Sequence, residues 1–76
     1  MNAHDRILDW CRSQAGKNAV NGYPGMREID RRCRVIDLNR TQEDPSLRWY
    51  TVPIVYADGA TWEECESQLK EKGFMP

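Results

Sequence analysis

The chain has few of the residues that catalysis uses and no motif that assembles them. It contains one histidine in 76 residues, and the patterns G-x-G-x-x-G, H-E-x-x-H and G-x-S-x-G are all absent. A dyad of His4 and Cys11 is excluded, because seven residues of helix would separate them by about 10 Å along the axis. Glu63, Glu64 and Glu66 fall in the first half of a predicted helix, where negative side chains interact favourably with the helix dipole. We therefore expect a protein that is not an enzyme and binds no cofactor.

The chain also lacks an excess of charge of either sign. It has 11 basic and 12 acidic residues and a net charge of −1, whereas proteins that read duplex DNA usually have a clear basic excess. The balance is uneven, since residues 21–40 hold five arginines and residues 41–76 hold seven acidic residues. Such asymmetry can orient a partner or a second subunit.

Long apolar runs are missing as well. The N-terminal residues are polar and contain no apolar segment typical of a signal peptide. The longest apolar run, Val52–Tyr56, is far shorter than the ~20 residues that a membrane-spanning helix needs. We expect a cytoplasmic protein with no membrane partner.

The cysteines are too few and too widely spaced for a disulfide framework. Cys11, Cys33 and Cys65 form an odd set, so we expect three reduced thiols that act as small apolar residues. The alternative is a zinc site that adds His4. Structural zinc sites usually contain close ligand pairs such as C-x2-C, and none is present here, so we expect no metal.

The first half of the chain predicts two helices and a strand. Asn2 is a good N-cap for a helix over residues 3–15, and Gly16 is placed to end it. The spacing of apolar residues predicts a short helix over 25–32, and the alternation that follows predicts a strand over 34–40.

The second half predicts a strand and a helix. Residues 48–56 alternate, with Tyr50, Val52, Ile54 and Tyr56 on one face and Trp49, Thr51, Pro53 and Val55 on the other. The T-x-x-E pattern that begins at Thr61 and the glycine at position 73 delimit a helix over 62–72.

Together these elements predict one small α+β domain over residues 1–76. Its order is helix, short helix, β-hairpin, helix, with the helices packed on one face of an antiparallel sheet. The sheet has two strands, or more if a second copy extends it. A lone hairpin is marginal and a domain of this size has a small core, so we expect a homodimer.

The function that these features favour is a small interaction or regulatory protein that binds a protein partner, such as an accessory protein of a phage or mobile element. Tryptophan beside arginine is typical of binding hot spots, and if the face with Tyr50 and Tyr56 covers the core, Trp49 and Val55 point outward. The candidate contact residues are Tyr23, Arg48, Trp49 and Val55.

Nucleic-acid binding through the arginine-rich segment 27–40 is the alternative. Residues 24–36 resemble a helix-turn-helix, with Met26-Arg27-Glu28-Ile29 leading into Arg31-Arg32-Cys33, although no third helix follows. The strand and helix from Arg48 to Phe74 are similar to the end of recombinase arm-type DNA-binding modules. Three strands precede the helix in those modules, and the sequence predicts two. The candidate residues for this alternative are Arg27, Arg31, Arg32 and Arg34.

Overall fold

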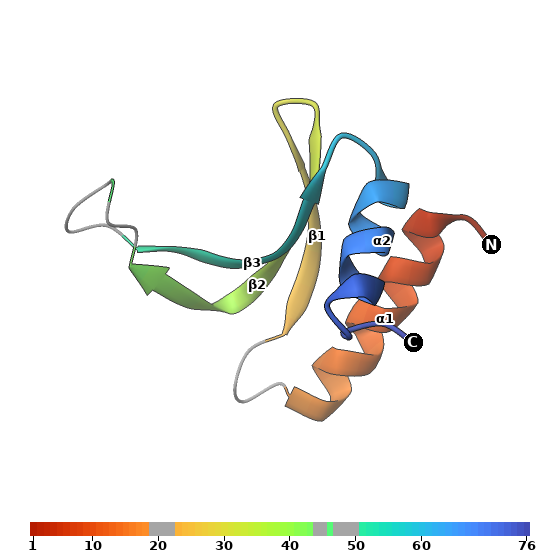
Figure 1. The fold of residues 1–76 in the computed structure, drawn as a ribbon. Coiled ribbons are helices and arrows are strands. Elements are labelled where there is room, and N and C mark those ends of the chain that lie inside the picture. The colour runs from red at the N-terminus through yellow and green to blue at the C-terminus, as the bar shows by residue number, and fades with distance from the viewer. Residues whose placement is uncertain (19–22, 44–45, 47–50) are drawn as a thin grey trace.

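The computed structural model contains two helices and three strands in one α+β domain. It describes residues 1–18, 23–43, 46 and 51–76. The elements in chain order are α1 (Ala3–Asn18), β1 (Pro24–Ile29), β2 (Arg32–Glu43), β3 (Thr51–Gly59) and α2 (Trp62–Glu71) (Figure 1). No helix among the described residues combines the length and apolar character needed to cross a membrane.

The sheet has three antiparallel strands in the order β1-β2-β3, so the predicted two-stranded sheet is wrong. The strand that was not predicted is β1, and its residues were expected to form the short helix 25–32. Met26 and Cys33 reach the same side of the sheet, because Met26 pairs with Val35 and Glu28 pairs with Cys33 across a tight turn. Spacing that suits one helix face therefore also suits a hairpin, and pairing with β2 decides between them.

The turn between β1 and β2 has an uncommon backbone. Asp30 and Arg31 both have positive φ angles, 52° and 63°. A two-residue hairpin loop of this geometry matches the right-handed twist of its strands, and it normally selects Asn-Gly or Asp-Gly. Asp30 suits its position, whereas Arg31 occupies one that favours glycine.

Both helices begin as the sequence predicts. Asn2 Oδ1 accepts a hydrogen bond from the backbone of Asp5 at 2.9 Å, which confirms the N-cap of α1. Thr61 Oγ1 caps α2 by accepting from the backbone of Glu64. The carboxylate of Glu64 reaches back one residue further than expected, to the N–H of Ala60 at 2.7 Å.

The two helices end differently. α2 ends in a Schellman motif, in which Gly73 has a φ of 83° and the N–H of Phe74 donates to Leu69 O at 2.9 Å. α1 continues through Gly16 to Asn18, so the predicted end at residue 15 is wrong. A glycine inside a helix costs only about 1 kcal/mol and does not by itself stop it.

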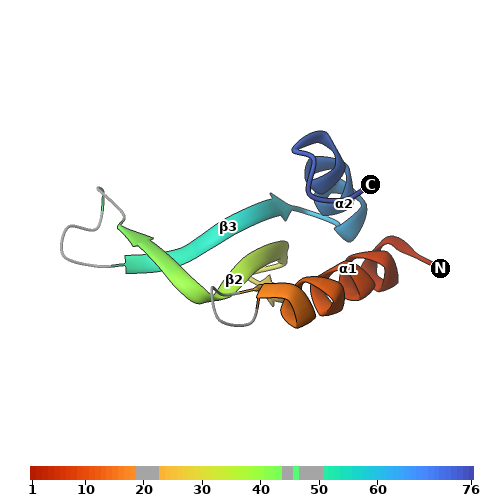
Figure 2. The same ribbon diagram turned by 90° about the horizontal axis from the view of Figure 1, so that it is seen from below.

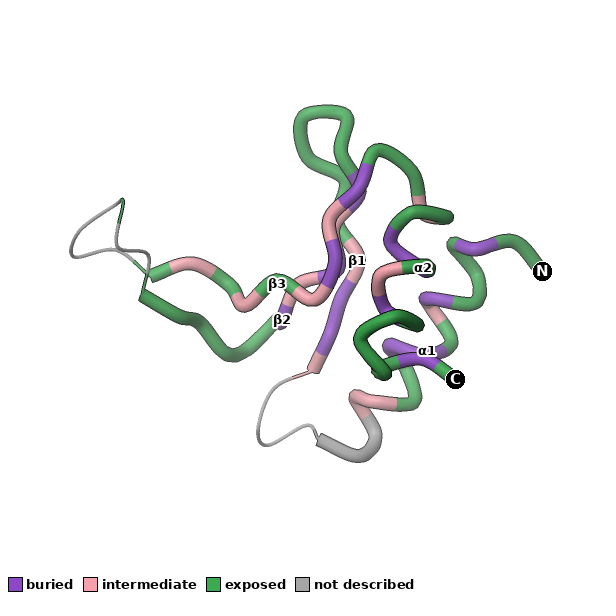
Figure 3. The backbone as a smooth tube through the Cα atoms, in the orientation of Figure 1, coloured by how far each residue is buried: buried purple, intermediate pink, exposed green. Residues whose placement is uncertain are grey.

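The core lies between the two helices and one face of the sheet. Figures 2 and 3 show both helices on this side, with the buried segments of the strands facing them. Ile7, Val35, Cys65 and Leu69 are the largest fully buried side chains. Trp10 of α1 belongs to the same cluster.

The outer halves of β2 and β3 extend beyond β1 as a two-stranded arm. The arm comprises residues 38–43 and 51–55, and it bends away from the helices toward the side of the sheet that they leave uncovered (Figures 1 and 2). The bend coincides with two irregularities. Tyr56 is an extra residue in β3 between two register pairs, and residues 37–40 of β2 oppose Ile54 alone.

A candidate docking surface on the open face of the sheet

The register of the strands assigns each side chain to one of two faces. Residues directly paired across an antiparallel sheet lie on the same face. Val35, paired with Met26 and Ala57, faces the helices. The alternate residues face the other way, on the side that no described helix covers (Figure 2). We call this side the open face. Its side chains are Arg27, Ile29, Arg32, Arg34, Ile36, Leu38, Val55 and Asp58.

The open face has an apolar part that is exposed. Ile29, Leu38 and Val55 are 49%, 39% and 42% exposed, and they are three of the five large hydrophobic residues with this much exposure among the described residues. Val55 is paired with the half-buried Ile36, so the two side chains are neighbours. Ile36, Leu38 and Val55 therefore form the apolar part of the open face, and the Arg27–Arg34 pair separates it from Ile29.

The side chain of Leu38 occupies space that is left free because residue 25 is a glycine. A Cβ atom built at Gly25 would lie only 2.6 Å from Leu38 Cγ and Cδ1. Gly25 pairs with Ile36 and therefore lies on the open face as well. The absence of a side chain at Gly25 lets Leu38 lie flat across β1, next to Ile36.

The charged part of the open face is built around one carboxylate. Asp58 Oδ1 accepts from Arg32 Nε at 2.9 Å, and Asp58 Oδ2 lies 3.3 Å from Arg34 Nε. Arg27 pairs directly with Arg34 across β1 and β2. Three arginines against one aspartate give this face a net positive charge, in a chain whose total charge is −1.

Asp58 is fixed in place by α2. The side-chain amide of Gln68 donates to Asp58 O at 2.7 Å, and its oxygen accepts from Asp58 N at 3.0 Å. Both backbone groups at this point of the outer edge of β3 are therefore occupied. The helix on the covered side thus positions the carboxylate that organises the arginines on the open side.

A hydrogen-bonded cluster sets the bend beside the apolar part. Tyr56 donates to Asp37 Oδ2 at 2.7 Å, and Asp37 Oδ1 accepts from the backbone N–H groups of Asn39 at 2.9 Å and Arg40 at 2.6 Å. Burial by itself would raise the pKa of Asp37, but these hydrogen bonds outweigh it and lower the pKa to about 2. Asp37 is therefore an ionised, fully bonded structural group.

The structure brings together most of the arginines proposed from the sequence. Arg27, Arg32 and Arg34 share the open face, whereas Arg31 lies in the turn at its end. The grouping follows from the alternation of side chains along β1 and β2, because the predicted helix 25–32 does not form.

The residues proposed for protein binding have a mixed outcome. Val55 is on the open face and exposed, as the alternation predicts. Tyr23 is half-buried, and its carbonyl accepts a hydrogen bond from Leu38 N at 2.9 Å. Arg48 and Trp49 lie outside the described residues.

Sequence reasoning missed Ile29, Leu38 and Asp58 as members of the surface. Ile36 and Leu38 alternate with Cys33, Val35 and Asp37 along β2, and it is the second set that is buried. Nothing local in the sequence says which of the two faces is covered. Only the position of the helices shows that the less apolar set is inside.

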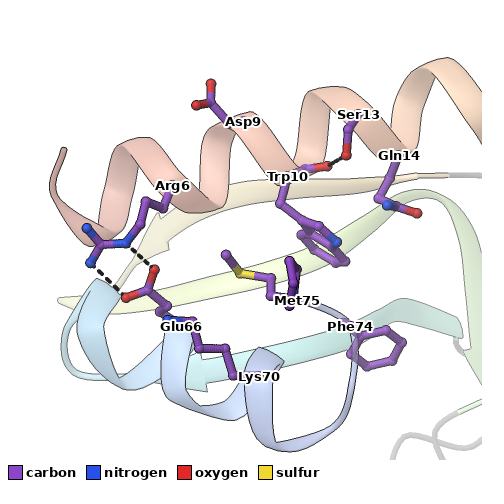
Figure 4. Close-up of a pocket in the computed structure, with 10 residues that line it drawn as sticks. Arg6, Asp9, Trp10, Ser13, Gln14, Glu66, Lys70, Phe74 and Met75 are labelled. Carbon is purple, nitrogen blue, oxygen red and sulfur yellow. Dashed lines mark hydrogen bonds and ion pairs between the residues drawn. The ribbon is translucent and has the colours of Figure 1, made fainter.

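A hollow of about 600 Å³ lies between α1 and α2, away from the open face (Figure 4). Trp10, Phe74 and Met75 form its apolar lining, and Arg6 and Glu66 close one end with a two-point ion pair that includes Nη2 to Oε1 at 2.9 Å. The hydrogen bond from Arg6 lowers the pKa of Glu66. Arg6 and Glu66 neutralise each other, so the hollow presents fewer unpaired charged groups to a ligand than the open face does.

The cysteines and the histidine form no metal centre in the part of the chain that the structure describes. The three thiols are free and buried. Burial raises the pKa of Cys11 and of Cys65 to about 11, and it also raises the pKa of Cys33. His4 is exposed and packs edge-on against Trp62, with a centroid distance of 5.6 Å.

The chain matches no protein-family model, no characterised protein and no solved structure.

Proposed function

We propose that this protein is a small interaction module without catalytic activity that binds a protein partner through the open face of its sheet. The observation that carries the proposal is the exposed pair Leu38 and Val55, which lie with Ile36 on the same face as Arg27 and Arg34. Apolar residues and arginine are enriched at the centre of protein interfaces, where lysine and acidic residues are depleted. Leu38 and Val55 lie where the bent arm begins, so the bend of the arm sets the shape of this end of the open face (Figure 1).

Photo-crosslinking in cells tests this proposal. A photoreactive amino acid at Val55 reports on the open face, and the same amino acid at the exposed Ser67 of α2 is the control. We expect a protein adduct at position 55 that survives nuclease digestion and is much weaker at position 67. Equal adducts at both positions, or none at position 55, would show that the open face is not the docking surface.

A second copy of the chain is a poorer fit to the open face than a different partner. Two copies placed face to face would bring six arginines together against two aspartates, and each Asp58 already contacts two arginines. The predicted homodimer is therefore better sought at a strand edge. Sedimentation of wild type and Val55→Asp separates the cases, because only a dimer over the open face dissociates in the variant.

Nucleic-acid binding stays the second candidate, because three strands now precede α2 and Arg27, Arg32 and Arg34 lie on one face of them. This is the element order of the recombinase arm-type modules that the C-terminal half resembles. The test is a mobility shift with labelled duplex over a range of salt concentrations. Affinity that falls steeply with salt supports this candidate, since each phosphate contact releases counterions.

A further inference from the structure

The arginines of the open face use only part of their hydrogen-bonding capacity. Asp58 contacts Arg32 and Arg34 through Nε in each case. No other described residue bonds to the two Nη groups of either arginine. The side chains are 50% and 41% exposed, so an incoming group can reach them.

The unused groups have a defined chemistry. A guanidinium presents five N–H donors in a planar fork, and it binds a carboxylate most strongly through two parallel hydrogen bonds. Asp58 restricts both side chains before any partner arrives, which reduces the entropy lost on binding. The two arginines are thus positioned to donate hydrogen bonds to the carboxylates of a binding partner.

The apolar group lies at a matching distance from these donors. Arg34 and Ile36 are two residues apart on one face of β2, which corresponds to roughly 6.5 Å. One turn of an α-helix advances about 5.4 Å, so a helix along β2 can place a carboxylate and an apolar side chain one turn apart over these positions. Helices are also the usual cover for a sheet face in layered domains.

We infer that the partner presents an acidic amphipathic α-helix to the open face. Its carboxylates bind the Nη groups of Arg32 and Arg34, and its apolar side chains cover Ile36, Leu38 and Val55. This inference rests on the proposed function and specifies the chemistry of the partner.

The composition of the face favours this occupant over a phosphate backbone. Asp58 offsets part of the charge of the three arginines, and the remaining excess is small for a nucleic-acid backbone, which carries one negative charge per phosphate. The apolar residues have no counterpart on a phosphate backbone, whereas they match the apolar stripe of an amphipathic helix. Charge complementarity and apolar area therefore point to the same class of partner.

The test uses three probes with the intact protein. The first is a synthetic amphipathic helix with leucines on one face and glutamates on both flanks of that face. The second is the same peptide with every glutamate replaced by glutamine, and the third is a short DNA duplex. NMR records the Arg Nε–Hε signals and the methyl signals of Ile36, Leu38 and Val55, and fluorescence anisotropy gives the affinities.

We expect the glutamate peptide to shift the signals of the open face and to bind at least about tenfold more tightly than the glutamine peptide. The double variant R32Q/R34Q should lose a similar factor, and R12Q on α1 should lose none. If the double variant does not fold, the two peptides on wild type still provide the comparison.

The remaining outcomes separate the two proposals. If both peptides bind the open face equally, the inferred carboxylate contacts are wrong while the docking surface stands. If only the duplex shifts these signals, both proposals fall in favour of nucleic-acid binding. If neither peptide nor duplex shifts any signal of the open face, the inferred acidic helix is contradicted, and the crosslinking experiment at position 55 decides whether the open face is a docking surface.

Discussion

The hydroxyl of Tyr56 donates a hydrogen bond of 2.7 Å to the carboxylate of Asp37, and the two residues are the irregular positions of β3 and β2. Each strand therefore departs from regular pairing at the point where it is bonded to the other. Arg40 completes the cluster, since its Nη2 donates to the Tyr56 hydroxyl at 3.0 Å. This cluster fixes the bend of the arm relative to the sheet.

The first prediction concerns the pH dependence of stability. The pKa of Asp37 is about 2 in the folded protein, below the ~3.9 expected in an unfolded chain. A group with a lowered folded pKa contributes stability above its unfolded pKa and loses it as the pH falls through the folded value. We predict that Asp37 contributes fully above pH ~4 and progressively less between pH ~4 and ~2.

Urea denaturation at a series of pH values measures this contribution. The variant Asp37→Asn should be less stable than wild type at neutral pH, and the difference should shrink below pH ~4. Ser67→Ala, at an exposed position of α2, is the control and should show no such convergence, because neither side chain titrates in this range. A constant difference between Asp37→Asn and wild type across this range would show that the carboxylate is not held ionised by the cluster.

The second prediction concerns the turn between β1 and β2. Asp30 and Arg31 have positive φ angles, and a non-glycine residue in this conformation costs about 1 kcal/mol or more. Replacing Asp30-Arg31 by Asn-Gly should raise Tm by roughly 4–8 °C. The matched control is Arg12→Gly in α1, which should lower Tm because glycine weakens a helix interior. Calorimetry of both variants decides, and no gain in the turn variant would contradict this backbone geometry.

The third prediction concerns the ends of α2. Thr61→Ala should cost about 1 kcal/mol by removing the oxygen that caps Glu64 N. Gly73→Val should cost more, because the φ of 83° is strongly unfavourable for a β-branched side chain. Chemical denaturation measures both. Unchanged midpoints would mean that the helix does not begin and end as described.

How far the fold can be predicted depends on how local its determinants are. α2 was predicted to within one residue, because Thr61 and Gly73 mark its ends by their own hydrogen bonds and backbone angles. β1 was not predicted, because its residues satisfy a helical spacing and only pairing with β2 decides otherwise. The extra residue Tyr56 shows the same limit, since a bulge is defined only by its partner strand.

The candidate surface was predictable in part for the same reason. Arginines 27, 32 and 34 were singled out by composition alone, and the hairpin then brought them to one face. Leu38 was visible as an apolar residue of a strand, but its exposure depends on which side the helices cover. Asp58 was not noticed, because its link to Arg32 spans 26 residues of sequence.

The fourth prediction concerns the thiols. Because burial raises the pKa of Cys11 and Cys65 to about 11, both are protonated at neutral pH and should react slowly with thiol reagents. Denaturant should make all three cysteines reactive. We also predict that the purified protein contains no stoichiometric zinc and keeps its circular dichroism spectrum in a chelator. One zinc ion per chain, lost together with the fold, would overturn this interpretation.

The fifth prediction concerns the open face itself. Val55 is 42% exposed and belongs to no part of the buried core cluster, so replacing it should leave the fold intact. The most direct test of the docking surface is co-purification from cells of the protein crosslinked through position 55, using tagged wild type and Val55→Asp. We predict that Val55→Asp unfolds within a few degrees of wild type and retains little or none of that partner. Full retention of the partner by a folded Val55→Asp variant would contradict docking on the open face.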